Sequence, residues 1–173
     1  MRIFILRVRH DLLQQALLMN GVKPWHIGEI LIQKKLIDWK QLEDALAEQK
    51  RTHEFVGEVL VRKHCIPRFL LFKALAERHA IPFVDLAHVF IDPCAVERVP
   101  KSVAVKYGFV PIEMRDGILV VGISDPCAVL PCLEIAELAR VSEIKTVLCT
   151  PDAVALAIGQ HYCEKDIETG ASL

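Results

Sequence analysis

Apolar residues recur every three or four positions through residue 78, as they do on one face of an α-helix. Residues 8–20 carry such a face and stop at Asn20-Gly21, so they predict an amphipathic helix that either packs on the rest of the domain or docks on a partner. From residue 109 onward the pattern changes to short runs rich in β-branched residues, which predict strands.

The helical pattern is present twice. HIGEILIQKKLIDWKQLEDALAEQ (residues 26–49) aligns without gaps with FVGEVLVRKHCIPRFLLFKALAER (residues 55–78), and five residues separate the two motifs. Each motif predicts two helices; Asp38 is a good N-cap for the second helix of the first motif, and Pro67 stands where the corresponding helix of the second motif would take its first residue. The duplication predicts a compact subdomain of four short helices.

Gly28 and Gly57 occupy the same place in the two motifs, at the start of the first helix. A residue without Cβ leaves the backbone N–H groups of a helix start open to an anion. It also allows two helices to pack closely. The sequence leaves both explanations open.

The second half predicts the order helix, strand, strand, helix, strand, helix. These elements are a helix at 101–107 ended by Gly108, strands at 109–115 and 118–124 joined by Asp116-Gly117, a helix from Ser124 to about Arg140, a strand at 144–149 and a helix from Pro151. Segment 83–86 should be extended and lead to a loop at Asp92-Pro93.

The predicted fold class is α+β. It consists of an N-terminal helical subdomain built from a tandem two-helix repeat, followed by a small α/β sandwich lobe with helices on one face of the sheet. The expected divisions are an N-terminal segment (1–23), the helical subdomain (24–82), the α/β lobe (83–163) and a polar, mobile tail (164–173).

Composition narrows the range of partners. A formal net charge of -1 and a pI near 6.6 argue against DNA or RNA, whose binding proteins usually carry a clustered basic excess. No apolar run long enough to span a membrane and no secretory signal is present, so we expect a cytosolic protein or one that a partner recruits to the inner membrane. Six scattered cysteines favour reduced thiols over a disulfide framework.

Motifs for catalysis are missing from the sequence. Gly117 and Gly122 have the spacing of P-loop glycines, but Ile123 and Ser124 stand where that motif needs Lys and then Ser or Thr, and the pattern of the segment predicts a strand. The cysteines and histidines lack the paired spacing of a zinc site, and no nucleophile with a base and an orienting group is recognisable. The sequence therefore predicts neither an enzyme nor a metal protein, and it predicts no cofactor.

The duplicated motif resembles the MshEN domain, also called the type II secretion E-protein N-terminal domain, found at the front of the ATPases that drive type II secretion and type IV pili and in some stand-alone regulators. That family has two 24-residue motifs separated by five residues, as here, and an α/β lobe similar to the segments IPFVDL, VPIEMRDGILVVGISDP and TPDAVALAI. The resemblance covers about residues 25–163.

The resemblance implies a regulatory domain that binds cyclic di-GMP. The phosphates of this ligand would lie at helix starts and its guanines on apolar side chains, while Asp125 matches an aspartate of the family that helps to hold the ligand. The implied ligand-binding residues are His26, Ile27, Gly28, Leu31, Leu42, Leu46, Gln49, Phe55, Val56, Gly57, Leu60, Leu71, Leu75, Arg78 and Asp125.

Three of these positions depart from the family pattern. His26 and Phe55 stand where strong binders have Arg, and Arg78 replaces the closing Gln. Losing a guanidinium contact weakens binding, because one charge-assisted hydrogen bond contributes about 1.5 to 3 kcal/mol. An alternative function is a protein-interaction module that links a secretion or pilus ATPase to its inner-membrane platform protein without binding a nucleotide.

Overall fold

A computed structural model describes residues 26–162, which divide into two compact units. We call residues 26–65 the helical unit and residues 66–162 the sheet unit. The division follows Cys65 and so falls inside the second motif, whereas the sequence predicts a boundary after residue 82. The second helix of that motif belongs to the sheet unit because its side chains pack there: the ring of Phe69 meets that of Phe83, and Arg68 pairs with Asp152 at 3.2 Å.

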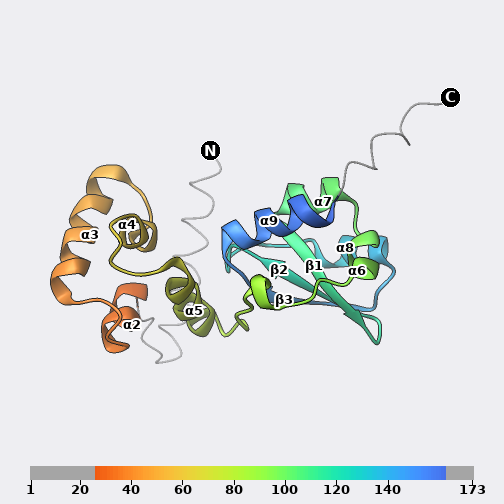
Figure 1. Ribbon diagram of the computed structural model, residues 1–173, viewed down its shortest axis with the longest axis horizontal. Helices are drawn as coiled ribbons and strands as arrows, with labels where there is room; N and C mark the ends of the chain where they lie inside the picture. The colour runs from red at the N-terminus through yellow and green to blue at the C-terminus, as the bar shows by residue number, and fades with distance from the viewer. Residues whose placement is uncertain (1–25, 163–173) are drawn as a thin grey trace. The chain divides into compact units, whose positions relative to one another are not determined.

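The helical unit contains α2 (Ile27–Gln33), α3 (Trp39–Thr52) and α4 (Val56–Arg62) (Figure 1). α2 and α4, the first helices of the two motifs, are both seven residues long and follow a residue in extended conformation. Two residues after the end of each helix the chain has a residue at φ 57°, Lys35 in the first motif and His64 in the second. The backbone itself therefore repeats at the offset that the sequence predicts.

The second helices of the two motifs begin differently. Asp38 caps α3 as predicted: its carboxylate accepts from the N–H of Gln41 at 2.8 Å, and the Gln41 side chain accepts from the N–H of Asp38 at 2.9 Å. Helix α5 (Arg68–His79) begins one residue later than predicted, so Pro67 is its N-cap and not its first residue. Pro67 offers no side-chain oxygen to the helix.

Burial follows the same repeat. Helices of seven residues are unstable alone, so they depend on the side chains that they bury. Apart from Ile27, whose equivalent Val56 is half-buried, the buried apolar positions of the first motif have buried equivalents in the second. These pairs are Leu31 and Leu60, Ile37 and Ile66, Leu42 and Leu71, and Ala45 and Ala74.

One ionic cluster ties the end of α3 to the end of α4. The carboxylate of Glu48 lies 2.6 Å from the Arg62 guanidinium and 2.7 Å from the Lys63 ammonium, and Arg62 also reaches Glu54 at 3.0 Å. The hydrogen bonds from Lys63 and Arg62 lower the pKa of Glu48 to about 2. Glu48 therefore stays charged in the folded unit under conditions that protonate an ordinary carboxyl.

The sheet unit contains three strands in the order β1-β2-β3 (Figure 1). β1 and β2 are antiparallel and joined by Asp116 (φ 52°) and Gly117 (φ 78°), which confirms the predicted hairpin, while β2 and β3 are parallel. The elements after α5 are η1 (Leu86–His88), α6 (Pro93–Glu97), α7 (Lys101–Tyr107), β1 (Phe109–Arg115), β2 (Ile118–Ile123), α8 (Cys132–Ala139), β3 (Glu143–Leu148) and α9 (Pro151–His161).

The α+β class and the order of elements from α7 to α9 are confirmed. The prediction that helices cover only one face of the sheet is wrong. Residues 109–112 of β1 are all buried, although successive residues of a strand point to opposite faces. Both faces are therefore covered at this end of the sheet. α7 and α9 lie side by side (Figure 1). Arg98 at the end of α6 donates to the carbonyl of Ala139 at the end of α8 at 3.3 Å.

Two local predictions were wrong. The helix expected from Ser124 begins only at Cys132, because Pro131 lacks an N–H and disfavours helical backbone at the residue before it. The loop expected at Asp92-Pro93 is the short helix α6, whose start is capped by the Asp92 carboxylate accepting from the N–H of Cys94 at 2.9 Å. The helix predicted at 8–20 and the tail predicted at 164–173 lie outside the described residues.

The ionic cluster predicts a pH dependence of stability. Because the pKa of Glu48 is lower in the folded state, its contribution is complete above about pH 4.5 and is lost as the pH falls toward about 2. We expect Glu48→Gln to lower the Tm at pH 7, and this deficit relative to wild type should shrink below pH 4.5. Thermal unfolding followed by circular dichroism at several pH values measures both effects.

Glu43→Gln is the matched control, since Glu43 is exposed on the same helix and makes no ion pair within residues 26–162. A Glu48→Gln deficit that persisted unchanged to pH 2.5, about the lowest practical pH for such unfolding, would contradict the role given to the carboxylate.

Candidate functional site

The predicted ligand-binding residues of the helical unit separate into buried and accessible groups. The accessible side chains mark the two helix starts and the outer face of α3: His26 and Phe55 precede α2 and α4 at equivalent positions, and Phe55 is 83% exposed. The remaining accessible residues are Leu46, Gln49 and Val56. The buried group comprises Ile27, Gly28, Leu31, Leu42, Gly57 and Leu60. The buried residues hold the helices together, so only the accessible ones present side chains to a ligand.

Gly28 has a packing role. A Cβ added at Gly28 would lie 2.6 Å from Cδ1 and 2.9 Å from Cδ2 of Leu42, which is itself 6% exposed. Of the two explanations for this glycine, close packing of α2 on α3 is the one that the structure supports. A site at this helix start would therefore be formed by the side chain of His26 and its neighbours rather than by an open glycine cradle.

A shallow groove of about 440 Å³ runs along α3 and was not predicted from the sequence. Its apolar part is formed by Trp39, which is 70% exposed, and Leu46, which is 41% exposed. Glu43 and Lys50 supply its charges. The tryptophan directly after the predicted N-cap Asp38 is the sequence signal that could have indicated this surface.

The sheet unit carries the other predicted residues, one after strand β2 and three in helix α5. Asp125 follows β2, is exposed, and accepts the N–H of Cys127 at 2.8 Å through Oδ1. Arg78 is half-buried in the last turn of α5. Burial and the charge of Asp125 raise the pKa of Cys127, whereas Arg78 opposes the rise, so both charges act on one thiol. Leu75 is half-buried and Leu71 is buried.

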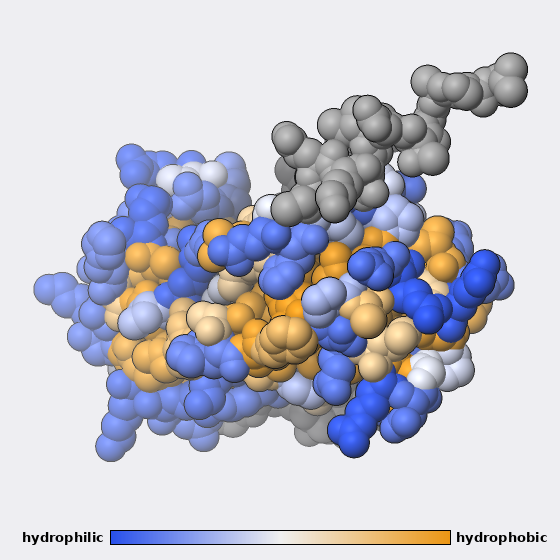
Figure 2. Space-filling model, turned by 45° about the vertical axis from the view of Figure 1, so that its right-hand side comes forward, coloured by the Kyte–Doolittle hydropathy of each residue, from blue (hydrophilic) through white to orange (hydrophobic). Residues whose placement is uncertain are grey.

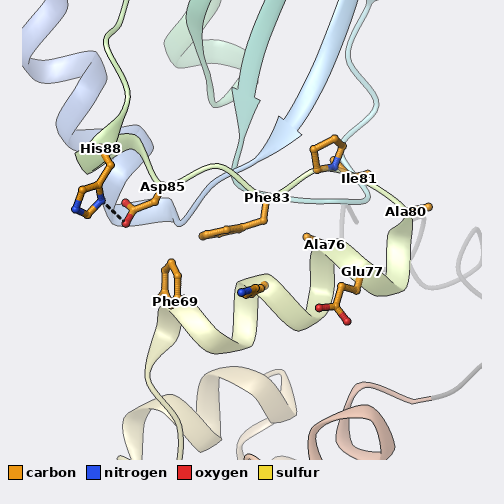
Figure 3. Close-up of a pocket in the computed structure, with 10 residues that line it drawn as sticks. Phe69, Ala76, Glu77, Ala80, Ile81, Phe83, Asp85 and His88 are labelled. Carbon is orange, nitrogen blue, oxygen red and sulfur yellow. Dashed lines mark hydrogen bonds and ion pairs between the residues drawn. The ribbon is translucent and has the colours of Figure 1, made fainter. Parts of the chain in front are cut away.

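A second groove, of about 780 Å³, lies between α5 and the segment after it (Figure 3). Phe69 and Phe83 meet edge to face there, with ring centroids 5.2 Å apart, and His88 Nδ1 lies 2.9 Å from the Asp85 carboxylate. The helical residues that line it, including Phe69, Lys73 and Glu77, recur at helical spacing on one face of α5. The opposite face of α5 carries the predicted ligand-binding residues Leu71, Leu75 and Arg78. This groove is therefore separate from those residues.

The titratable and sulfur-containing residues of the described part of the chain are mostly scattered. Residues 26–162 contain no group of three or more His, Cys, Asp or Glu that could hold a metal ion, and their five cysteines are unpaired. Burial raises the pKa of Cys149 to about 12, which keeps this thiol protonated. Gly122, one of the two glycines with P-loop spacing, lies within β2.

Several large apolar side chains reach the surface. Figure 2 shows apolar residues between hydrophilic ones on the face it presents. The most exposed in residues 26–162 are Phe55, Leu133, Phe90, Val129 and Trp39. Within the same residues no helix is both long and apolar enough to cross a membrane.

Comparison with known proteins identifies the family. The MshEN domain model matches residues 79–167, about half of the chain, so the chain belongs to the MshEN domain family. The matched region covers most of the sheet unit and begins at the end of the second motif. The family resemblance of the α/β lobe is thereby confirmed.

Two of the curated relatives are type IV pilus assembly ATPases. The chain is 39% identical over 108 residues to the type IV pilus assembly ATPase PilB of Thermus thermophilus, and 29% identical over 139 residues to PilB of Myxococcus xanthus. These alignments cover 62% and 80% of this chain but only 12% and 24% of the relatives. The chain thus corresponds to a small part of each ATPase.

The fold matches a solved structure described as MshE with cdg. The TM-score is 0.65 at 22% sequence identity, and the match covers 80% of this chain and 99% of that one. At this identity the likeness establishes the fold.

The packing of Gly28 generates a stability prediction. Gly28→Ala should destabilise the helical unit by roughly 1–3 kcal/mol, because the added methyl group must displace Leu42 from its buried position. Urea denaturation followed by circular dichroism measures the change. Gly159→Ala in α9 is the control: nothing lies within 4 Å of its Cβ, so it should raise stability by about 0.5–1 kcal/mol. A neutral or stabilising Gly28→Ala would refute the packing role.

Proposed function

We propose that this chain is a regulatory domain that binds cyclic di-GMP and controls a type IV pilus or type II secretion ATPase. The observation that carries the proposal is the repeat itself: equivalent helix starts bear the accessible side chains His26 and Phe55. Family membership, the PilB relatives and the fold shared with MshE, whose solved structure contains this nucleotide, support it.

The chemistry of the ligand suits a duplicated motif. Cyclic di-GMP has two like halves, each with an anionic phosphate and a flat guanine that presents N–H donors on one edge. In the helical unit, exposed apolar groups such as Phe55 and Leu46 offer surfaces for guanines. In the sheet unit, the exposed Asp125 carboxylate is an acceptor for N–H donors. In this proposal the buried motif residues act by holding the helices in place.

The departures from the family motif predict weak binding. Where strong binders have Arg, the His26 imidazole lacks the paired N–H donors of a guanidinium, and Phe55 offers no side-chain hydrogen bond. Both side chains are exposed, so their replacement need not disturb the core.

Isothermal titration calorimetry with cyclic di-GMP tests the proposal. The wild-type protein should bind, and His26→Arg should bind roughly tenfold or more tightly, because a guanidinium makes paired hydrogen bonds to a phosphate. His161→Arg, an equivalent change at an exposed position of α9, should leave affinity unchanged. Absence of heat at about millimolar ligand, the weakest range that calorimetry resolves, would end the proposal. Equal affinity of wild type and His26→Arg would remove His26 from the site.

A second function is favoured by the exposed apolar side chains. Trp39, Phe90 and Leu133 are each at least 70% exposed, and such residues are typical of protein contact surfaces. The corresponding proposal is a module that joins the ATPase to its inner-membrane platform protein. Co-purification with the platform protein that is insensitive to cyclic di-GMP, and that Trp39→Ala or Leu133→Ala abolishes, would support this function over nucleotide sensing.

A further inference from the structure

The segment after α5 adds one short edge to the sheet. The N–H of Leu148 in β3 donates to the carbonyl of Pro82 at 2.8 Å, and the N–H of Val84 donates to the carbonyl of Leu148 at 2.9 Å. Phe83 lies between these two bonds, and successive residues of an extended chain direct their backbone groups to opposite sides. The N–H and the carbonyl of Phe83 therefore point away from β3. Neither has a hydrogen-bond partner within the part of the chain that the structure describes.

Residues of this edge also line the groove beside α5 (Figure 3). Ile81, Phe83 and Asp85 come from the edge, and Phe69 comes from the helix. The ring of Phe69 is 42% exposed and meets that of Phe83 edge to face, so the groove has an apolar aromatic surface. Domains that bind extended peptides often do so between a strand edge and a neighbouring element, where the strand pairs with the peptide backbone and pockets take alternate side chains.

Lys73 supplies the charge to which a bound segment can respond. Its side chain is exposed, and it makes no ion pair or hydrogen bond within the described residues. The acids of the groove are already engaged. Asp85 accepts the N–H of Ala87 at 3.1 Å and lies 2.9 Å from Nδ1 of His88, and Glu77 also has an interaction partner. The groove therefore favours a segment that brings a carboxylate to Lys73.

The spacing along α5 fits an extended chain. Lys73 follows Phe69 by four residues, which corresponds to about 6 Å along a helix. An extended chain advances about 6.6 Å over two residues, and side chains two residues apart share one face. Two side chains of one bound strand can therefore meet the aromatic pair and the ammonium group together.

We propose that this groove binds an extended segment of a partner protein that carries an apolar residue and an acidic residue two positions apart. The backbone of the segment pairs with the N–H and carbonyl of Phe83. Its apolar side chain packs on the rings of Phe69 and Phe83, and its carboxylate pairs with Lys73. This inference is independent of nucleotide binding, because the predicted ligand-binding residues of α5 lie on the opposite face of the helix.

Fluorescence anisotropy with labelled peptides and the whole chain tests the proposal. The probes are the peptide Thr-Asp-Thr-Ile-Thr-Val and its reverse, Val-Thr-Ile-Thr-Asp-Thr, each labelled with fluorescein, and one of the two orders should bind. Methylating the backbone nitrogens of Ile and of the residue after it removes the donor to the Phe83 carbonyl and should weaken binding roughly 5- to 10-fold. Binding by neither peptide, or equal binding of the methylated form, would overturn the proposal.

A charge exchange tests the role of Lys73. Lys73→Glu should weaken binding of the acidic peptide roughly 5- to 10-fold, and it should bind better the peptide in which Lys replaces Asp. Lys145→Glu, at an exposed position of β3, is the matched control and should bind the acidic peptide as wild type does. If Lys73→Glu binds both peptides as wild type does, the assignment of an acidic residue to the partner is wrong.

Two further measurements locate the bound segment and exclude another occupant. Hydrogen exchange followed by NMR should show that the amide of Phe83 exchanges more slowly when the peptide is bound, whereas an unchanged rate would contradict pairing at this edge. Light scattering reports whether copies of the chain pair with each other. A dimer that the acidic peptide dissociates would assign the edge to a second copy and overturn the choice of a partner segment.

Discussion

The helical unit depends on burial that two short helices cannot achieve alone. α2 and α4 are seven residues long, and such helices persist in water only when packed against others. Leu31 and Leu60, both fully buried, anchor them, and Gly28 lets α2 approach Leu42 on α3. These contacts fix the positions of the two helices. They therefore also fix the direction in which the side chains of His26 and Phe55 leave the backbone at the helix starts.

This constraint explains why each motif contains both buried residues that pack the helices and accessible residues that do not. The leucines and glycines that make the repeat recognisable are mostly buried, and their spacing reflects helix packing. Among the accessible positions of the motif are two at which the copies differ: His26 against Phe55, and Gln49 against Arg78. A chain can therefore keep the buried residues that the fold needs while its accessible motif positions change.

The sheet unit contributes a rigid edge. β2 and β3 run parallel, so their carboxyl ends meet, and α5 is bonded to this edge through the segment that pairs with Leu148. The region matched by the family model coincides with most of this unit. Asp125 gains its fixed position from the turn after β2, whereas the groove beside Phe69 and Phe83 lies on the other face of α5.

Local patterns in the sequence determined the repeat, the two helices in each motif, the hairpin at Asp116-Gly117 and the α+β class, because periodicity and turn residues act over a few neighbours. They also brought Asp125 and Arg78 into the candidate set through the family resemblance. Only tertiary structure decided that Gly28 is a packing residue, that α8 starts as late as Cys132, and that α5 joins the sheet unit. Periodicity shows which face of a helix is apolar but not what it packs against, so burial and unit boundaries emerge only from contacts between residues distant in sequence.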